Sequence, residues 1–260
     1  MKRNIIIVAA LAIAGLCSCQ KEDLPTTKNI IDATVEAASD DASKTTVGED
    51  FSLNWASGDK FEVYKNDNLG SKAGVATLTG GEGTKNGKFE FSTEATLSNQ
   101  YIAYYPYYSE ENGKHWVRPT EGGKLSWTLN SYILDNTHPM PMFGTFTSAN
   151  SVSFKPVYSV LRFVSKSGKE ISKVKYDFRS AGGYKNNKTV YVDSNGNITY
   201  ATGGDDNFTL DSDMGLFKPF TVSGGQKITV TVTYSDSTSK TYTIKDLGIQ
   251  VGHIKTFKVD

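Results

Sequence analysis

The residue types best suited to catalysis are scattered along the chain. His115, His138 and His253 are the only histidines, and none stands in a metal-ligand spacing such as His-Glu-x-x-His. No Gly-x-Ser-x-Gly turn and no phosphate-binding loop is present. The 260 residues contain two cysteines, at positions 17 and 19, so a nucleophilic thiol further along the chain is absent.

One acidic cluster has ligands that Ca²⁺ prefers. It consists of Asp205, Asp206, Asn207, Asp211 and Asp213. Its spacing departs from the EF-hand loop, so a solvated loop is the favoured interpretation. The sequence therefore predicts no enzyme, no cofactor and no metal site. A hydrolase would need two carboxylates facing each other across a cleft, a pair that sequence alone does not reveal.

Aromatic residues that could stack on a sugar ring gather near the middle of the chain. Residues 101–105 alternate as a strand, so one of its faces should be buried. Beyond Pro106 the strand should end, which would leave Tyr107, Tyr108 and Trp116 on a loop. These three are the candidate glycan contacts.

The N-terminus has the pattern of a secretory signal peptide. Lys2 and Arg3 precede an apolar run over residues 5–16. As a helix this run would cover about 18 Å, which is too short for the roughly 30 Å hydrocarbon core of a bilayer. Export from the cytoplasm, with removal of the signal, is therefore predicted.

The end of the signal, Leu16-Cys17-Ser18-Cys19, resembles a bacterial lipobox. That resemblance implies cleavage before Cys19 and acylation of this cysteine, so residues 1–18 are the signal and 19–28 a lipidated tether to the outer membrane. Cys17 is the alternative site, but Leu16 before it is too bulky for the usual cleavage pocket. The next residues, Gln20-Lys21-Glu22-Asp23, resemble the surface-export tag of Bacteroidota lipoproteins.

Charge and composition narrow the class of protein. The 28 basic and 28 acidic residues balance, and no block of Lys and Arg stands out, so no nucleic-acid partner is predicted. Both cysteines lie at the signal boundary, so the mature chain must be held together by its core without disulfides.

Short alternating runs separated by turn residues recur throughout the chain. Residues 60–64, 171–178 and 227–234 alternate apolar and polar side chains, and Asn195-Gly196 predicts a hairpin. This pattern predicts an all-β chain of two antiparallel β-sandwich domains, 29–165 and 166–260. Residues 95–98 and 126–136 are the places where short helical turns could occur.

Five segments in order resemble one family. They are 53–64 with its Trp-x-x-Gly-Asp motif, 101–107 with Tyr-Pro, Pro141-Met142-Phe143-Gly144, 154–163 and 251–257. Together they resemble the fimbrillin-like (major-fimbrium-like) lipoproteins of Bacteroidota. The resemblance implies two transthyretin-like β-sandwich domains in tandem, a place on the cell surface, and a role in pilus (fimbria) assembly or cell adhesion. Its partners would be other pilus subunits or ligands on host or matrix surfaces.

In pilus members of this family, a protease removes the first strand and a neighbouring subunit donates a replacement. Here the strand at risk would hold Ile31, Ala33 and Val35, and Lys44 would be the processing site. Two departures argue against a stalk subunit: no arginine lies between Arg3 and Arg118, and no donor tail is evident after the last strand. They favour an anchor, a tip protein or a non-polymerising adhesin.

Two further interpretations stay open. Asp236-Ser237-Thr238 resembles the short O-glycosylation motif of exported Bacteroidota proteins, with Ser237 as the acceptor. A glycan-binding surface lipoprotein of a polysaccharide-uptake system is the alternative function, and the aromatic loop is the feature that would serve it.

Overall fold

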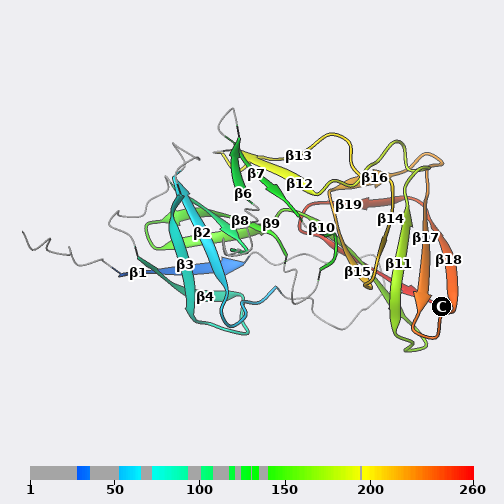
Figure 1. Ribbon diagram of the computed structural model, residues 1–260, viewed down its shortest axis with the longest axis horizontal. Coiled ribbons are helices and arrows are strands. Elements are labelled where there is room, and N and C mark those ends of the chain that lie inside the picture. The colour runs from blue at the N-terminus through cyan, green and yellow to red at the C-terminus, as the bar shows by residue number, and fades with distance from the viewer. Residues whose placement is uncertain are drawn as a thin grey trace, which may run out of the picture.

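The computed structural model describes residues 28–35, 53–65, 72–92, 101–107, 117–120, 124–129, 131–134, 140–193 and 195–260. Within these residues the chain forms twenty β-strands and no helix (Figure 1). A helix with the length and apolarity needed to cross a membrane is accordingly not found among them. The prediction of an all-β chain is confirmed for this part of the protein.

Seven strands of the first half close into a barrel, in the order β1-β4-β3-β2-β5-β8-β9. Their bounds are β1 Lys28–Val35, β2 Lys60–Lys65, β3 Lys72–Gly80, β4 Asn86–Ser92, β5 Tyr101–Tyr105, β8 Met142–Ser148 and β9 Ser151–Pro156. Neighbours pair antiparallel except β1 and β9, which are parallel. The sheet therefore closes on itself at its first strand, whereas the sequence predicted a β-sandwich for this half of the chain.

A second sheet covers one side of the barrel. Its order is β13-β12-β7-β6, with β6 Val117–Thr120, β7 Lys124–Thr128, β12 Thr189–Asp193 and β13 Ile198–Tyr200. Leu125, Val190 and Val192 of this sheet belong to the same buried cluster as Tyr104 and Phe143 of the barrel. Because of this cover, both faces of β5 are buried, whereas alternation alone predicted one buried face.

The remaining strands form a second layered body beside the barrel (Figure 1). One layer is the sheet β14-β11-β17-β18, and the other is the sheet β15-β10-β20 with the pair β16-β19. The bounds are β10 Ser159–Ser165, β11 Ile171–Asp177, β14 Asn207–Leu210, β15 Met214–Phe217, β16 Phe220–Val222, β17 Ile228–Tyr234, β18 Ser239–Ile244, β19 Leu247–Ile249 and β20 Ile254–Val259. Inward side chains of β17 (Ile228, Val230, Val232 and Tyr234) alternate with threonines and are buried in the core between the layers.

The two halves of the chain are interleaved. The β12–β13 hairpin comes from the second half, but β12 pairs with β7 of the first half. In return, Tyr132 of the first half is buried in the second core, and Leu216 of the second half is buried in the first. A boundary between residues 165 and 166 stays a prediction, and whatever the boundary, each half supplies part of the other's packing.

Candidate functional site

The first strand, β1, lies between two neighbours that come from distant parts of the chain. It pairs with β4 over seven residues on one side and with β9 over four on the other. Ile31, Ala33 and Val35 point into the barrel and are at most 2% exposed. Ile31, Ala33 and Val35 therefore lie in a strand, as the sequence predicted, and replacement of this strand by a neighbouring subunit stays a prediction.

Two backbone hydrogen bonds to residues outside the neighbouring strands hold the C-terminal half of β1. The backbone N–H of Asp32 donates to Asn150 O at 2.8 Å, and that of Val35 donates to Lys85 O at 2.9 Å. The opposite face of the strand carries Ile30, Asp32 and Thr34, which are exposed. Ile30 is 45% exposed and is the only large hydrophobic side chain of the described residues that stands out into solvent.

Trp55 links the Trp-x-x-Gly-Asp segment to β1. Its indole Nε1–H donates to the carbonyl of Ala33 at 3.2 Å. Its ring packs edge-on against Phe89, Tyr105 and Phe154, at centroid distances of 4.9, 5.3 and 5.4 Å. Trp55 is thus a buried core residue that is hydrogen-bonded to β1.

Asp59 fixes the turn that positions Trp55. Its carboxylate accepts from Ala56 N at 2.7 Å and from the Tyr105 hydroxyl at 2.9 Å. Gly58 before it has φ of 82°, a left-handed conformation that glycine adopts without strain. Burial raises the pKa of the Asp59 carboxyl above its ordinary value, although both hydrogen bonds act in the opposite direction.

The structure describes only some of the aromatic residues that could stack on a sugar ring. Tyr101, Tyr104 and Tyr105 are buried, so they cannot contact a glycan in this conformation. Tyr107 is half-buried, with the Lys72 ammonium 5.0 Å from its ring centroid. Tyr108 and Trp116 lie outside the described residues, so the glycan site stays a prediction.

The modification sites can be placed in the same way. Cys19 and Lys44 lie outside the described residues. Ser237 is exposed at the tip of the β17–β18 hairpin, with φ of 67°. That position leaves its hydroxyl accessible, and glycosylation of Ser237 stays a prediction.

The acidic cluster is dispersed in the folded chain. Asp205 accepts a hydrogen bond from the Tyr132 hydroxyl at 3.1 Å. Asp211 pairs with Lys173 at 3.5 Å and Asp213 with Arg162 at 3.9 Å. The described ranges bring together no group of three or more potential metal ligands.

Asn186 is a buried polar residue that the sequence did not single out. Asn186 is fully buried, donates to Leu216 O at 2.9 Å, and accepts from the Tyr184 hydroxyl at 3.0 Å and from Lys218 N at 3.1 Å. Its own carbonyl accepts from the Tyr132 hydroxyl at 3.0 Å. Asparagine usually indicates a surface loop, so only its tertiary partners reveal this role.

No family model matches this sequence, and no curated protein is similar to it. Solved structures do resemble it in fold. A proposed cell adhesion protein from Bacteroides ovatus has a TM-score of 0.51 and 17% identity, over 90% of this chain and 93% of that one. Another from Parabacteroides distasonis has a TM-score of 0.46 and 10% identity, over 90% and 89%. A fimbrial assembly protein of the same species has a TM-score of 0.41 and 10% identity, over 89% and 91%.

The Bacteroides ovatus structure defines the fold class of this protein. The match extends over nearly the whole of both chains, so both halves take part in it. This chain therefore shares the fold of that Bacteroides ovatus protein.

Proposed function

We propose that this protein is a cell-surface, fimbrillin-like lipoprotein that acts in pilus assembly or cell adhesion. The observation that carries the proposal is the position of β1, a single strand that completes the barrel between β4 and β9. It is supported by the shared fold with a proposed adhesion protein and by the lipobox-like sequence at Cys19.

In this proposal β1 is the strand that a neighbouring subunit could replace. Loss of β1 would leave β4 and β9 each with one unpaired edge and would uncover the ring of Trp55. A donated strand would restore the main-chain bonds and would place apolar side chains where Ile31 and Val35 now lie. The Trp55 indole would then donate to the main-chain carbonyl of whichever residue of the donated strand takes the place of Ala33.

The finer structural assignment belongs to the same proposal. We treat the two bodies as the tandem transthyretin-like domains that the family resemblance implies, with the barrel as the donor-accepting domain. The protein would then be anchored in the outer membrane through Cys19 and exposed at the cell surface. Its partners would be pilus subunits or host and matrix ligands, and it would have no catalytic role.

The mature N-terminus tests this proposal. It should be measured by mass spectrometry on the protein recovered from whole cells. Acylated Cys19 alone would indicate that β1 is retained and that the protein is an anchor or a monomeric adhesin. A start near Thr45 would indicate removal of β1 and a polymerising subunit. A cytoplasmic protein that still begins at Met1 would contradict both.

The alternative function, glycan binding for polysaccharide uptake, rests on the aromatic loop beyond Pro106. A glycan array separates the two functions, because a dose-dependent polysaccharide signal without pilus association would favour the alternative. Trp116→Ala with unchanged glycan binding would remove the proposed contact.

A further inference from the structure

The strand β18 lies at the edge of the sheet β14-β11-β17-β18. It pairs antiparallel with β17 over its whole length, without a shift of register. On the outer face of the sheet, the hydroxyls of Thr231 and Thr241 are in contact at 3.0 Å. Those of Thr233 and Ser239 are in contact at 2.9 Å. These cross-strand pairs help to keep β18 straight and in register, so its other side is a regular strand edge.

The backbone groups on that other side have no partner among the described residues. Tyr234 N donates to Thr238 O at 2.9 Å, and this bond fixes the alternation along the hairpin. Because every second residue of an antiparallel strand bonds to the same neighbour, the N–H and C=O groups of Thr241 and Thr243 point away from β17. They form an edge that a further strand could join.

The inward side of β18 is apolar and incompletely covered. Tyr242 lies opposite Val230, which is fully buried. Ile244 lies opposite Ile228, which is also fully buried. Tyr242 and Ile244 themselves are half-buried at the margin of the same core. A strand paired with β18 would cover both of these side chains further.

Two opposite charges flank this apolar pair. Lys240 is opposite Val232, so it lies on the inward side of β18, with its ammonium 5.9 Å from the Tyr242 ring centroid. Asp246 follows the strand and is exposed. In the part of the chain that the structure describes, neither has an ion-pair partner. An inward lysine on an edge strand normally discourages pairing, so a strand that joins β18 must bring a carboxylate to Lys240.

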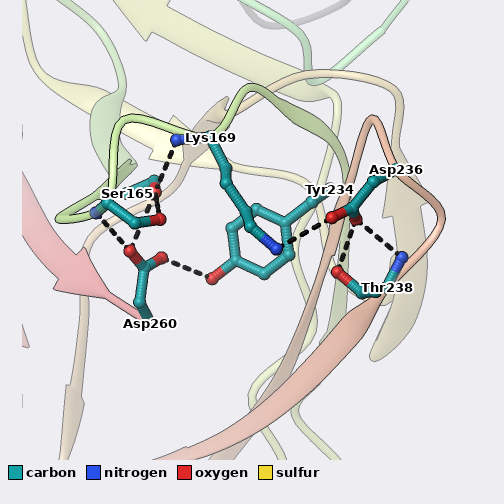
Figure 2. A network of polar contacts seen from close by, with 7 residues as sticks. Ser165, Lys169, Tyr234, Asp236, Thr238 and Asp260 are labelled. Carbon is teal, nitrogen blue, oxygen red and sulfur yellow. Dashed lines mark hydrogen bonds and ion pairs between the residues drawn. The ribbon is translucent and has the colours of Figure 1, made fainter.

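Figure 2 shows how the end of β17 and the turn after it are held to the loop between β10 and β11. The Tyr234 hydroxyl donates to Asp260 at 2.8 Å, and Asp260 also accepts from the Ser165 hydroxyl at 3.0 Å. Asp236 pairs with Lys169 at 2.8 Å. The hairpin is therefore fixed to the rest of this body, and both carboxylates are engaged by groups other than Lys240.

The edge of β18 is complementary to itself in one register. Two copies can pair antiparallel about a two-fold axis that passes between their Thr243 residues. Tyr242 of each copy then lies opposite Ile244 of the other, and the two half-buried side chains cover each other. Lys240 of each copy lies across from Asp246 of the other. Because of the symmetry, each of these contacts occurs twice.

The neighbouring registers lack this complementarity. A pairing centred on Tyr242 would place Lys240 opposite the apolar Ile244. A pairing centred on Thr241 would place Ile244 opposite the exposed Thr238. Neither brings a carboxylate to Lys240, so the register centred on Thr243 is favoured.

We propose that β18 pairs with β18 of a second copy of this chain, in the register centred on Thr243, and joins the two sheets into one. Main-chain bonds and the covered apolar pair supply the affinity, and the contact of Lys240 with Asp246 selects the register. One strand from each copy is a small interface, so the dimer is weak and depends on concentration. β18 lies in the second body and β1 in the barrel, so the proposal does not rest on exchange of β1.

Sedimentation of the full mature chain is the first test. We expect a dimer whose fraction rises with concentration, and a protein that stays monomeric up to about 1 mM would overturn the proposal. Lys240→Glu should weaken the dimer by at least about tenfold, because it faces Asp246 of the other copy with a like charge. Lys175→Glu, on the outer face of β11, is the matched control and should leave the dimer unchanged. Equal effects of the two variants would also overturn the proposal.

Proline substitutions distinguish the two edges of this sheet. Phe178 N donates to Asp206 O at 2.7 Å, so alternation points the N–H of Thr209 away from β11, at the outer side of β14. Thr243→Pro and Thr209→Pro each remove one outward donor, on opposite edges. Only Thr243→Pro should remove the dimer. Loss of the dimer in Thr209→Pro alone would mean that β14 joins the copies and would overturn the proposal.

Cysteine cross-linking tests the register without a change that disturbs folding. At the centre of the pairing, the two residues at position 243 would have Cα atoms about 5.5 Å apart, which suits a disulfide. The two residues at position 241 would be about 14 Å apart along the strands. Thr243→Cys should therefore cross-link on mild oxidation, and Thr241→Cys should not. The unaltered protein, with cysteines at 17 and 19, gives the background. Cross-linking of Thr241→Cys instead, or of neither variant, would overturn this pairing.

Discussion

At the scale of single residues, the Trp-x-x-Gly-Asp segment is a support for the first strand. Asp59 ties the turn to Ala56 and to the Tyr105 hydroxyl, and the turn places the Trp55 indole against the carbonyl of Ala33. The contacts with Tyr105 and with Ala33 join segments far apart in sequence, so the motif acts through tertiary structure.

The raised pKa of Asp59 makes a prediction about pH. Since the folded pKa lies above the unfolded value of 3.8, the contribution of Asp59 to stability is largest below that value. It declines as pH rises through the folded pKa. The Asp59→Asn variant keeps an oxygen that can accept from Ala56 N, and it has no titrating group at this position, so its stability should not show this decline with pH. The free energy of unfolding, measured with urea from pH 3 to 7, should fall with rising pH in the native protein relative to the variant. A difference between the two free energies that stays constant with pH would contradict this prediction.

Two buried tyrosines should respond oppositely to loss of their hydroxyl. Tyr176 is fully buried, and its hydroxyl has no hydrogen-bond partner in the described structure. Tyr176→Phe should therefore be neutral or stabilising by up to about 1 kcal/mol. The Tyr132 hydroxyl donates to Asn186 O and Asp205, so Tyr132→Phe should cost about 1–2 kcal/mol. Denaturant unfolding measures both, and a clear loss of stability in Tyr176→Phe would indicate an unseen bond.

At the scale of elements, β4 illustrates how closely the barrel is packed around β1. A Cβ on Gly87 would lie 2.7 Å from Trp55 Cδ1 and 2.7 Å from Phe89 Cε2. Neither ring can move far, because Trp55 also packs against Phe154 and Phe61 packs against Phe89. Glycine at this position permits the close approach of β4 to Trp55, whose indole is hydrogen-bonded to β1.

Gly87→Ala should therefore destabilise the protein by about 1–3 kcal/mol through overpacking. Gly80→Ala, in the neighbouring strand β3, is the matched control, because its Cβ would meet nothing closer than Lys88 Cβ at 3.9 Å. Thermal unfolding followed by circular dichroism compares the two variants. Equal transition temperatures would show that the residues around Gly87 can shift to accommodate a methyl group, which would contradict this prediction.

At the scale of the whole molecule, the two bodies share buried contacts. Leu216 N donates to Tyr132 O at 2.6 Å, and the Tyr158 hydroxyl donates to Asn187 O at 3.2 Å. Each of these bonds joins the first half of the chain to the second. A destabilising substitution in one body should therefore also lower the stability of the other.

We predict that the protein unfolds in a single cooperative transition. Asn186→Ala would leave Leu216 O and Lys218 N without their partner in a buried site, which costs about 1–3 kcal/mol for each group. Differential scanning calorimetry should show one peak in the native protein and one peak at lower temperature in the variant. Two separate peaks in the native protein would mean that the bodies unfold independently.

Much of the fold could be predicted from the sequence because strand formation is largely local. Alternation of apolar and polar residues marks a strand with one buried face, and it correctly predicted the runs around 60–64, 171–178 and 227–234. The same alternation is present at Ile31, Ala33 and Val35, whose side chains are buried in the structure. The separate prediction of a helical turn within 126–136 was wrong for residues 126–128, which belong to β7, because pairing with β12 overrides local preference.

Local pattern could not determine which strands meet. Nothing in the sequence near β1 indicates a parallel pairing with β9, and nothing near β12 indicates that it joins β7. The sequence by itself predicted the all-β chain and the side chains that face its core, and the lipobox-like export signal stays a prediction from the sequence. Tertiary structure decided the closure of the barrel, the burial of both faces of β5 and the polar contacts of Asn186. Those features depend on contacts between residues far apart in the chain, which a two-residue period does not encode.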